Sequence, residues 1–240
     1  MESPFTYSKP ITGQWFIGRE AESRTLSNLL TQGENILISE PPKSGKGSLI
    51  RQTFLSLKSR GCQFIPVFVE LMSIRSKEDF ILRLGSETLK AAFSTPQDYS
   101  NAIASLLPNT HFIFDSEAFS RSGEILSLNW DMDSHDISAI ISLPYRIGAT
   151  TGKKIFVTLS EFQNIALTDG QYEICQAFET LFGTLDASEH TYASYIISGS
   201  RVNAMEQILR GPSRLGRFTE RIQFGEIDTR IIIDHVIKGF

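Results

Sequence analysis

The sequence predicts a three-layer α/β/α fold in which helices cover both faces of a mainly parallel, five-stranded sheet. Two observations support this prediction. Short apolar runs rich in strand-forming residues alternate along the chain with longer segments whose apolar residues recur at helical spacing. The apolar runs are nearly continuous, which is typical of strands buried on both faces of a parallel sheet. With 240 residues and 41% hydrophobic content, the chain can form one substantial core.

The first elements form a βαβα unit. A helix is expected over residues 20–30, because acidic residues come early, apolar residues follow at helical spacing, and Gly33 can end it. The apolar run at 36–38 is too short for a helix and predicts the first core strand. By the same criteria, the next elements are a proline- and glycine-rich loop at 40–47, a helix at 48–57, a strand at 64–69 and a helix at 77–92.

Between residues 96 and 133 the pattern changes. Two strand-forming runs, 111–114 and 125–128, flank a polar stretch that contains glycine, and this arrangement predicts an inserted β-hairpin. A helix is then expected over 136–148, where Pro144 requires a bend or an early break. The remaining elements are predicted to be a strand at 154–159, a helix at 173–185, a strand at 193–197, a short helix at 204–209 and a strand at 221–224.

The chain is expected to contain one main domain, residues 1–227, followed by the start of a helical lid at 228–240. The last segment predicts a helix over 229–240 whose apolar face has no later partner, so we expect the chain to be a fragment. No stretch of about 18 uninterrupted apolar residues occurs. The first residues also lack the basic start and apolar run of a signal peptide. We therefore expect a soluble, cytoplasmic protein that does not contact membranes.

Charge and metal-ligand spacing narrow the functional classes. The formal net charge of −4 and the isoelectric point near 5.6 give no overall electrostatic reason to bind nucleic acid or an anionic membrane. Cys62 and Cys175 have no zinc-site spacing, and the four histidines are scattered, so no metal site is predicted from them. Asp131, Asp133 and Asp136 lack the glycine and the closing glutamate of a calcium loop, which favours a polar loop that caps the following helix.

A candidate phosphate-binding loop lies between the first predicted strand and the helix after it. Such a loop needs an abrupt strand end, backbone N–H groups that converge on an anion, and a helix N-terminus that adds positive dipole. The pattern GxxxxGK[ST] is matched at Gly45 and Lys46, but Glu40 replaces the first glycine and Gly47 the metal-binding hydroxyl. The candidate nucleotide-binding residues of this loop are Pro42, Lys43, Ser44, Gly45, Lys46, Gly47 and Ser48.

Both departures from the pattern are expected to weaken binding. Glu40 adds a negative charge near the expected phosphates and a Cβ where glycine would permit a tight turn. Gly47 lacks the hydroxyl that would coordinate Mg²⁺. Ser48 is a candidate replacement metal ligand, but a helix turns about 100° per residue, so its hydroxyl points elsewhere unless the loop shifts. A simple Pro/Gly turn that opens a helix is the alternative interpretation.

A second altered site follows the strand predicted at 154–159. In P-loop ATPases, one carboxylate after this strand organises the Mg²⁺ shell and the next polarises the attacking water. Ser160 occupies the metal position and can bind Mg²⁺ only weakly, through a coordinated water, whereas Glu161 keeps the position of the general base. The alternative interpretation of Glu161 is a solvated residue after a strand. Weak Mg²⁺ binding and slow or absent hydrolysis are therefore expected.

With these motifs, the chain resembles the archaeal-type ATPases of the STAND/AAA+ P-loop superfamily, including the set common in bacteria of the Bacteroides group, but with degenerate Walker A and Walker B motifs. The resemblance covers nearly all of the chain. It rests on the order and spacing of five segments: FIGRE at 16–20, PPKSGK at 41–46, EFQNI at 161–165, ISGSR at 197–201 and GR at 216–217.

The resemblance implies roles for residues outside the loop. Ile17 and Arg19 would lie beside the base and ribose of ATP or ADP, and Ser200 would sense the γ-phosphate. Arg217 would contact a phosphate in cis, or in trans within an oligomer. With Glu161, Ser200 and Arg217 are the candidate catalytic residues. Such ATPases typically carry a helical lid and a winged-helix domain after the core, so nucleic acid is expected as a partner only through a C-terminal domain absent from this sequence.

Two functions remain as alternatives. In the first, ATP or ADP, with weakly bound Mg²⁺, occupies the loop, and the state of the site biases an attached lid, effector domain or protein partner. In the second, the chain is a pseudo-ATPase that keeps the fold as a protein-interaction scaffold. The retained polar groups favour the switch, namely Lys46, Glu161, Ser200 and Arg217. The altered positions favour the scaffold, namely Glu40, Gly47 and Ser160.

Overall fold

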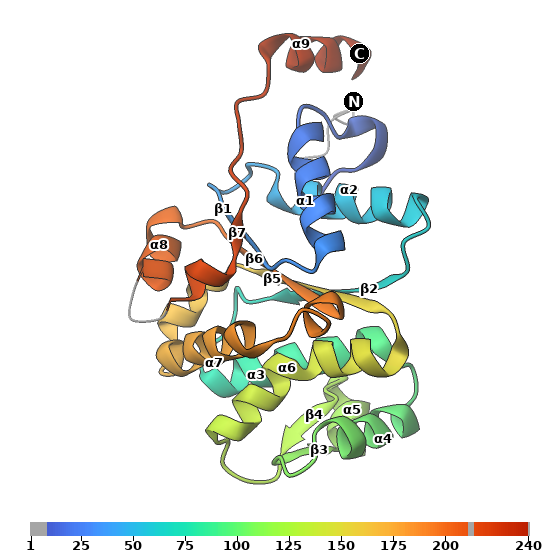
Figure 1. The fold of residues 1–240 in the computed structure, drawn as a ribbon, viewed down its shortest axis with the longest axis vertical. Helices are drawn as coiled ribbons and strands as arrows, with labels where there is room; N and C mark the ends of the chain where they lie inside the picture. The colour runs from blue at the N-terminus through green and yellow to red at the C-terminus, as the bar shows by residue number, and fades with distance from the viewer. Residues whose placement is uncertain (1–8, 211–213, 240) are drawn as a thin grey trace.

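A computed structural model describes residues 9–210 and 214–239. Its centre is a five-stranded sheet with the strand order β2-β5-β6-β1-β7, in which all neighbouring strands are parallel. This arrangement confirms the predicted parallel sheet, and Figure 1 shows it between two layers of helices. The strands are β1 (Ile36–Ser39), β2 (Phe64–Glu70), β5 (Lys154–Ser160), β6 (Ala193–Gly199) and β7 (Glu220–Arg221).

Helices pack on both faces of the sheet, as expected for strands that are buried on both sides. On β1, Ile36 and Ile38 pack with the helices of one layer, whereas Leu37 packs with the core of the other. This alternation follows the two-residue period of a strand. One layer consists of α1 (Glu20–Gln32) and α2 (Lys46–Ser59), and the other contains α3 (Lys77–Ala92), α6 (Ser134–Thr151) and α7 (Gln171–Thr184) (Figure 1).

The strand register brings several strand ends to one edge of the sheet. Ser39, the last residue of β1, pairs with Gly199, the last residue of β6. Glu70, at the end of β2, pairs with Ser160, at the end of β5. The segments that follow these strands therefore start side by side. In α/β proteins, ligands bind at the loops that follow the carboxyl ends of parallel strands, so a binding site is expected at this edge.

Helix ends follow the sequence signals where these are strong. Gly33 caps α1 in the left-handed conformation. Asp133 caps α6 and forms a reciprocal capping box with Asp136, which confirms that this acidic segment is a helix cap. The fully buried Asp136 carboxylate also accepts hydrogen bonds from the backbone N–H and the ring Nδ1 of His111, at 2.9 and 2.8 Å. The cap thereby attaches the inserted segment to the core.

Of the two outcomes expected at Pro144, a bend or an early break, the early break does not occur, because α6 continues to Thr151. A proline inside a helix removes one hydrogen bond and crowds the preceding turn. Here the neighbours of Pro144 are deeply buried, among them Leu143 and Ile147 with no exposed surface. Their packing against the sheet stabilises the helix across the proline. Tertiary burial commonly overrides a local propensity in this way.

The inserted segment differs in part from the predicted hairpin. Its two strands, β3 (Phe112–Phe114) and β4 (Leu126–Leu128), pair in antiparallel fashion as predicted. However, α4 (Pro96–Leu106) precedes them and α5 (Ser116–Ser122) connects them, and neither helix was predicted. Both start at recognisable caps, because Thr95 accepts a hydrogen bond from the Asp98 N–H, and Asp115 accepts from the first turn of α5.

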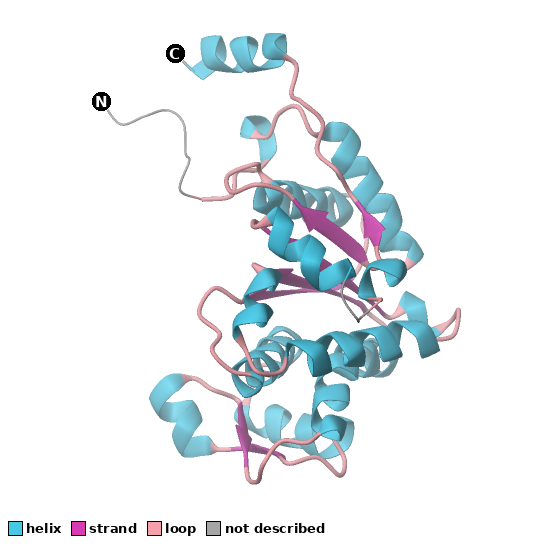
Figure 2. Ribbon diagram, turned by 90° about the vertical axis from the view of Figure 1, so that its left-hand side faces the viewer, coloured by secondary structure: helices cyan, strands magenta, loops and turns pink. Residues whose placement is uncertain are grey.

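The remaining described elements are short, apart from two helices: η1 (Gly13–Trp15), η2 (Phe162–Leu167), η3 (Glu189–Thr191), α8 (Val202–Arg210), η4 (Leu215–Phe218) and α9 (Thr229–Gly239). The helix predicted over the last residues forms as α9, which lies apart from the sheet beyond an extended segment (Figures 1 and 2). Its large apolar side chains are exposed, among them Ile233 and Ile237. Its role as the start of a lid stays a prediction.

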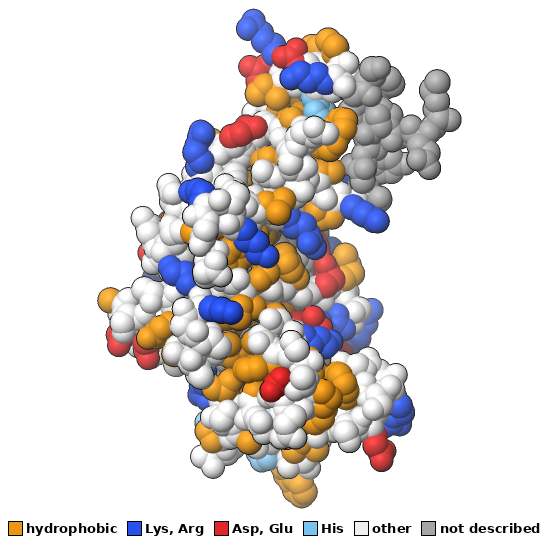
Figure 3. Space-filling model, turned by 90° about the vertical axis from the view of Figure 1, so that its right-hand side faces the viewer, with side chains coloured by type: hydrophobic (Ala, Val, Ile, Leu, Met, Phe, Trp, Pro, Cys, Tyr) orange, Lys and Arg blue, Asp and Glu red, His pale blue; other side chains and the backbone are white. Residues whose placement is uncertain are grey.

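The surface carries mixed charges. On the face shown in Figure 3, lysine and arginine side chains are interspersed with acidic and apolar ones. None of the helices in the described ranges combines the length and the apolar character required to cross a membrane.

Candidate functional site

The loop between β1 and α2 forms the first part of the candidate site. Gly45 caps the N-terminus of α2 with a φ of 97°, a left-handed conformation that glycine adopts without strain. Lys43 also has a positive φ, 63°, and the Ser44 N–H closes a turn onto the Pro41 carbonyl at 3.3 Å. Left-handed residues so close together curl the backbone into a concave loop of the kind that binds anions. The N-terminus of the 14-residue helix α2 adds partial positive charge there.

Backbone strain is concentrated at this edge of the sheet. The described residues other than glycine with positive φ are Lys43, Asn109 and Glu161. Such a conformation costs roughly 1 kcal/mol or more for an ordinary side chain, and it persists where the surroundings impose it. Two of the three residues are at the candidate site, one in the loop and one directly after β5. Strain of this kind is a frequent mark of functional sites.

Lys46 is folded across the loop that precedes it. Its Nζ donates hydrogen bonds to the carbonyl oxygens of Glu40 and Pro41, at 2.7 and 2.8 Å. Burial lowers the pKa of Lys46, and the carboxylates of Glu161 and Glu40 act in the opposite direction. Lys46 and Glu161 border the same cavity, so the two motifs predicted from the sequence lie close together. The ammonium group itself binds the first residues of its own loop.

Glu161 is held by two polar side chains. Its Oε2 accepts a hydrogen bond of 2.5 Å from the Ser200 hydroxyl and one of 2.6 Å from Gln163 Nε2. Ser200 follows β6 and Glu161 follows β5, so the register of these two strands brings them together. Gln163 is only 4% exposed. A carboxylate fixed in this way presents its other oxygen, Oε1, in a defined direction.

A cavity of about 240 Å³ lies beside the loop. It is bounded by residues from the start of α2, from the ends of β2, β5 and β6, and from the N-terminal segment: Pro10, Lys46, Gly47, Ile50, Arg51, Phe68, Glu70, Thr158, Ser160, Glu161 and Ser198. Loss of solvation raises the pKa of Glu70, and the charge of Glu161 acts in the same direction. The hydroxyl of Thr158 is buried and has no hydrogen-bond partner among the described residues.

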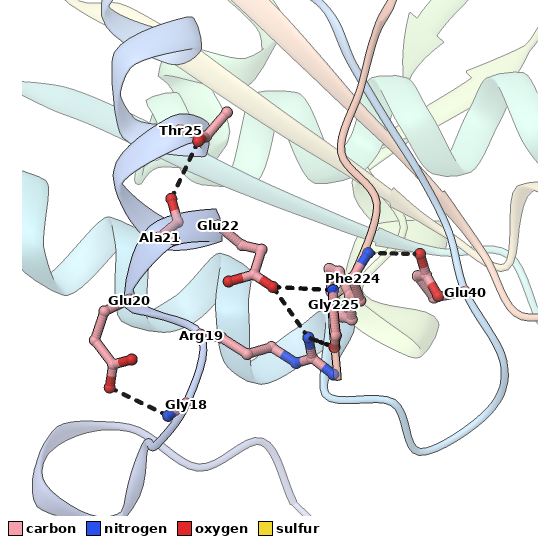
Figure 4. Close-up of polar contacts among 9 residues, drawn as sticks. All are labelled: Gly18, Arg19, Glu20, Ala21, Glu22, Thr25, Glu40, Phe224 and Gly225. Carbon is pink, nitrogen blue, oxygen red and sulfur yellow. Dashed lines mark hydrogen bonds and ion pairs between the residues drawn. The ribbon is translucent and has the colours of Figure 1, made fainter. Parts of the chain in front are cut away.

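The Glu40 carboxylate binds the backbone of a distant segment. Its Oε1 accepts a hydrogen bond of 2.9 Å from the Phe224 N–H (Figure 4). The backbone N–H of Glu40 donates to the Gly199 carbonyl at 3.2 Å. Phe224 follows β7 and leads towards α9. The residue that replaces the first loop glycine thus attaches the loop to the segment that leaves the sheet.

Arg19 binds the same segment from the other side. Its guanidinium bonds to the Gly225 carbonyl and to Glu22, both at 3.2 Å, and lies 4.1 Å from the centre of the Phe224 ring (Figure 4). Glu22 in turn accepts a hydrogen bond from the Gly225 N–H at 3.3 Å. A Cβ on Gly45 would lie 3.8 Å from Arg19 Nε, so this arginine is next to the loop. Its position beside the base and ribose stays a prediction.

Gly47 and Ser48 contact the N-terminal segment. The Ser48 hydroxyl accepts a hydrogen bond of 3.0 Å from the Ile11 N–H. A Cβ on Gly47 would lie 3.3 Å from Pro10 Cγ, which is a tight approach. Pro10 therefore covers the position where a P-loop ATPase carries its metal-binding hydroxyl. The possible metal role of Ser48 stays a prediction, and its hydroxyl would have to leave Ile11 to perform it.

The other predicted residues occupy less central positions. Arg217 is exposed on η4, which packs against α7, and it makes no hydrogen bond or ion pair with the loop within residues 9–210 and 214–239. Ile17 is partly buried next to Gly18, where an added Cβ would collide with Ile227. Pro42 is exposed on the loop.

Three residues around the site were not predicted as site residues from the sequence, namely Gln163, Thr158 and Glu70. Gln163 belongs to the segment EFQNI, two residues after Glu161, which places it within reach of that carboxylate. Thr158 lies two residues before Ser160, so it shares a face of β5 with it. Glu70 is an acidic residue directly after an apolar strand. The same criterion that selected Glu161 would have found Glu70.

Comparison with known proteins supports the fold. No protein-family model and no curated protein sequence matches the chain. Among solved structures, a Walker-type ATPase of Pyrococcus abyssi is similar over 97% of this chain and 61% of its own, with 20% identity and a TM-score of 0.59. The ORC2 protein of Aeropyrum pernix, solved in ADPNP–ADP complexes, matches 97% of this chain and 54% of its own, with 11% identity and a TM-score of 0.60.

A third similar structure is Cdc6p of Pyrobaculum aerophilum, with 14% identity and a TM-score of 0.55 over 99% of this chain and 54% of its own. The chain thus spans little more than half of the length of these proteins. Identities this low establish the architecture alone. The strand order, the two helix layers and these similarities together show that the chain shares the fold of these ATPases, a parallel five-stranded sheet between two layers of helices.

Proposed function

We propose that the chain binds ATP or ADP on the loop at residues 40–47 and acts as a nucleotide-dependent switch with weak or absent hydrolysis. The observation that carries this proposal is the meeting of Lys46, Glu161 and Ser200 at one sheet edge, beside a loop with two left-handed residues. A cation and a helix N-terminus are the groups that bind phosphate at a P-loop, and a fixed carboxylate is the group that orients the attacking water.

In the proposed complex, Lys46 exchanges the carbonyls of Glu40 and Pro41 for the β- and γ-phosphates. Backbone N–H groups of the loop and the N-terminus of α2 bind the same phosphates. Ser200 senses the γ-phosphate through the hydroxyl that now binds Glu161, so its hydrogen bond reports whether that phosphate is present. Arg217 would contact a phosphate only after a rearrangement, or from a neighbouring copy of the chain.

Weak hydrolysis follows from the groups around the cavity. Mg²⁺, when bound, neutralises phosphate charge in the transition state. Gly47 offers no hydroxyl and Ser160 no charge for this ion. Glu161 Oε2 already accepts two hydrogen bonds, which leaves Oε1 to orient a water molecule. The site is therefore better suited to holding a nucleotide than to rapid turnover.

The contacts of Glu40 and Arg19 suggest how the site acts as a switch. Both residues bind the segment at Phe224 and Gly225, which leads to α9. A ligand that changes the loop would alter these bonds and so bias whatever follows α9, a lid, an effector domain or a protein partner. Contact with nucleic acid would require a further domain, such as the winged-helix domain that the resemblance implies. We propose the cytoplasm as the location.

A protein-interaction scaffold without nucleotide is the second candidate function. Two contacts favour it. Lys46 bonds to the carbonyls of its own loop, which closes the loop without a ligand. Pro10 also covers Gly47, on the side where a metal ion would bind.

Thermal unfolding distinguishes the two functions. A nucleotide at about 100 times its Kd stabilises the folded state by about 2.7 kcal/mol, which corresponds to a rise in Tm of roughly 5–10 °C for a chain of this size. We expect ADP to produce such a rise in EDTA as well as in Mg²⁺, because the loop and Lys46 bind phosphate without the metal. No change in Tm at millimolar ADP or ATP would support the scaffold and contradict the switch.

A further inference from the structure

We infer that a divalent cation binds in the cavity beside Lys46 and that Glu70 of β2 supplies the carboxylate that Ser160 lacks. The inference rests on the proposed function, because the cation would bridge this cavity and the phosphates of a nucleotide on the loop. It assigns the metal ligand to a strand on which the sequence motifs do not place one.

The strand register places Glu70 close to the altered metal position. Glu70 and Ser160 are paired residues at the ends of adjacent strands, and adjacent strands lie about 4.8 Å apart. Both line the same cavity, together with Lys46 and Glu161. Moving the carboxylate from β5 to β2 therefore displaces it by a single strand spacing and keeps it in the lining of the same cavity.

The side chains of both strands point into the same layer. Phe68, two residues before Glu70, packs against Phe54 of α2 with ring centres 5.7 Å apart. Phe156, four residues before Ser160, packs against the same ring at 5.8 Å. Because side chains alternate along a strand, Glu70 and Ser160 also lie on the α2 face. This is the face on which the loop and Lys46 lie.

Thr158 provides an independent indication of a ligand. It is 2% exposed, it lines the cavity, and its hydroxyl has no hydrogen-bond partner among the described residues. A buried hydroxyl without a partner is costly and rare unless water or an ion satisfies it. The cavity thus offers two carboxylates, from Glu70 and Glu161, and two hydroxyls, from Thr158 and Ser160. Oxygen donors of this kind are the ligands that Mg²⁺ and Mn²⁺ prefer.

The competing contacts leave room for a cation. Glu70 Oε1 accepts a hydrogen bond of 3.2 Å from the Met72 N–H, so Oε2 is available for an ion. Lys46 and Arg51 also border the cavity and offset the two carboxylates. The Arg51 guanidinium lies over the ring of Phe68, with its Cζ 4.5 Å from the ring centre. We therefore expect the cation to bind weakly by itself and more tightly when a nucleotide adds negative charge.

Mn²⁺ binding measured by electron paramagnetic resonance tests the inference directly, because bound Mn²⁺ loses its sharp six-line signal. The titration uses the whole chain, with and without ADP. We expect Glu70→Gln to weaken Mn²⁺ binding by at least about tenfold, in line with losses on removing metal-site partners. The matched control is Glu34→Gln, which makes the same change at an exposed glutamate before β1, at the opposite end of the sheet. Equal Mn²⁺ affinity in the wild type and Glu70→Gln would overturn the inference.

The Thr158→Val variant provides a second test, which distinguishes a metal ligand from a residue with a purely structural role. Removing a buried hydroxyl without a partner should raise the Tm in EDTA, because no hydrogen bond is lost. The same change should weaken Mn²⁺ binding. Unchanged Mn²⁺ affinity would remove Thr158 from the site. Stabilisation by ADP in EDTA tests the loop alone. If ADP did not stabilise the chain in EDTA but Mn²⁺ still bound, the proposed nucleotide switch would be contradicted. The proposed metal site would still be supported.

Discussion

Replacing Lys46 with alanine will strongly reduce the stabilisation that ADP or ATP confers on this chain. In the proposed complex, the Lys46 ammonium exchanges two backbone carbonyls for phosphate oxygens. Hydrogen bonds to charged groups contribute about 1.5–3 kcal/mol, which corresponds to a loss of affinity of roughly tenfold to hundredfold. Isothermal titration calorimetry with ADP measures the loss directly. The fall in affinity should be nearly the same in EDTA and in Mg²⁺, since the lysine acts without the metal.

The control for this experiment is Lys58→Ala. Lys58 is exposed in the last turn of α2, the same helix that Lys46 begins, so the variant removes an equal charge far from the loop. Each variant should be compared with its own ligand-free state, because Lys46→Ala also loses the bonds to Glu40 and Pro41. If ADP still stabilised Lys46→Ala as it does the wild type, the nucleotide would bind elsewhere on the molecule.

Restoring the two missing metal-site residues will raise hydrolysis. Gly47→Thr returns a hydroxyl and Ser160→Asp a carboxylate at the positions where P-loop ATPases hold Mg²⁺. We expect ATP turnover to rise by about tenfold to hundredfold over the wild type, which corresponds to about 1.4–2.7 kcal/mol of transition-state stabilisation. Phosphate release in the presence of Mg²⁺ measures this change.

The structure adds a condition to this prediction. A Cβ at position 47 would lie 3.3 Å from Pro10 Cγ, so threonine fits only if the N-terminal segment moves. Pro10→Ala removes that contact and should increase the gain from Gly47→Thr. Adding Glu161→Gln to the restored variant should return turnover to background, which excludes a contaminating ATPase. Fast turnover by the wild type would contradict the view that lost metal ligation limits this site.

The sequence was sufficient to predict which motifs meet. Lys46 follows β1 and Glu161 follows β5, and the carboxyl ends of parallel strands lie at one edge of a sheet. Ser200 directly follows β6, but its hydrogen bond to Glu161 was not predicted. A pattern of alternating strands and helices predicts a parallel sheet, whereas the strand order and the direction of a side chain depend on packing. For this reason Gln163 was also missed, although it stands two residues from Glu161.

Contacts between distant segments could not be predicted from local patterns. Glu40 is 184 residues from Phe224, and no local pattern predicted the hydrogen bond that its carboxylate accepts from the Phe224 N–H. That its charge weakens phosphate binding stays a prediction. Pro10 covers Gly47 through a similar long-range contact. In each case a residue that departs from the P-loop pattern has a partner elsewhere in the chain. A residue that departs from a motif can therefore take part in other contacts of the fold, and it need not indicate loss of function.

Local signals in the inserted segment could have predicted its two helices, α4 and α5. Thr95 with Pro96, and Asp115 with Gly123, are ordinary marks of helix starts and ends, yet the glycine and polar residues between the two strands favoured a hairpin loop. Arg217, by contrast, was selected from the resemblance and not from a local signal. The resemblance implies a phosphate contact, but the residue is exposed on η4. A role in trans would require an assembly that one chain does not contain.

The central claim is that the backbone of residues 41–47 binds the phosphates of a nucleotide. A two-dimensional ¹H–¹⁵N NMR titration with ADP in EDTA tests this most directly, because it reports on each backbone amide separately. The account predicts that the amide signals of Ser44, Gly45, Lys46 and Gly47 shift together with a single Kd. Shifts centred on another part of the chain, with these loop amides unchanged, would contradict it.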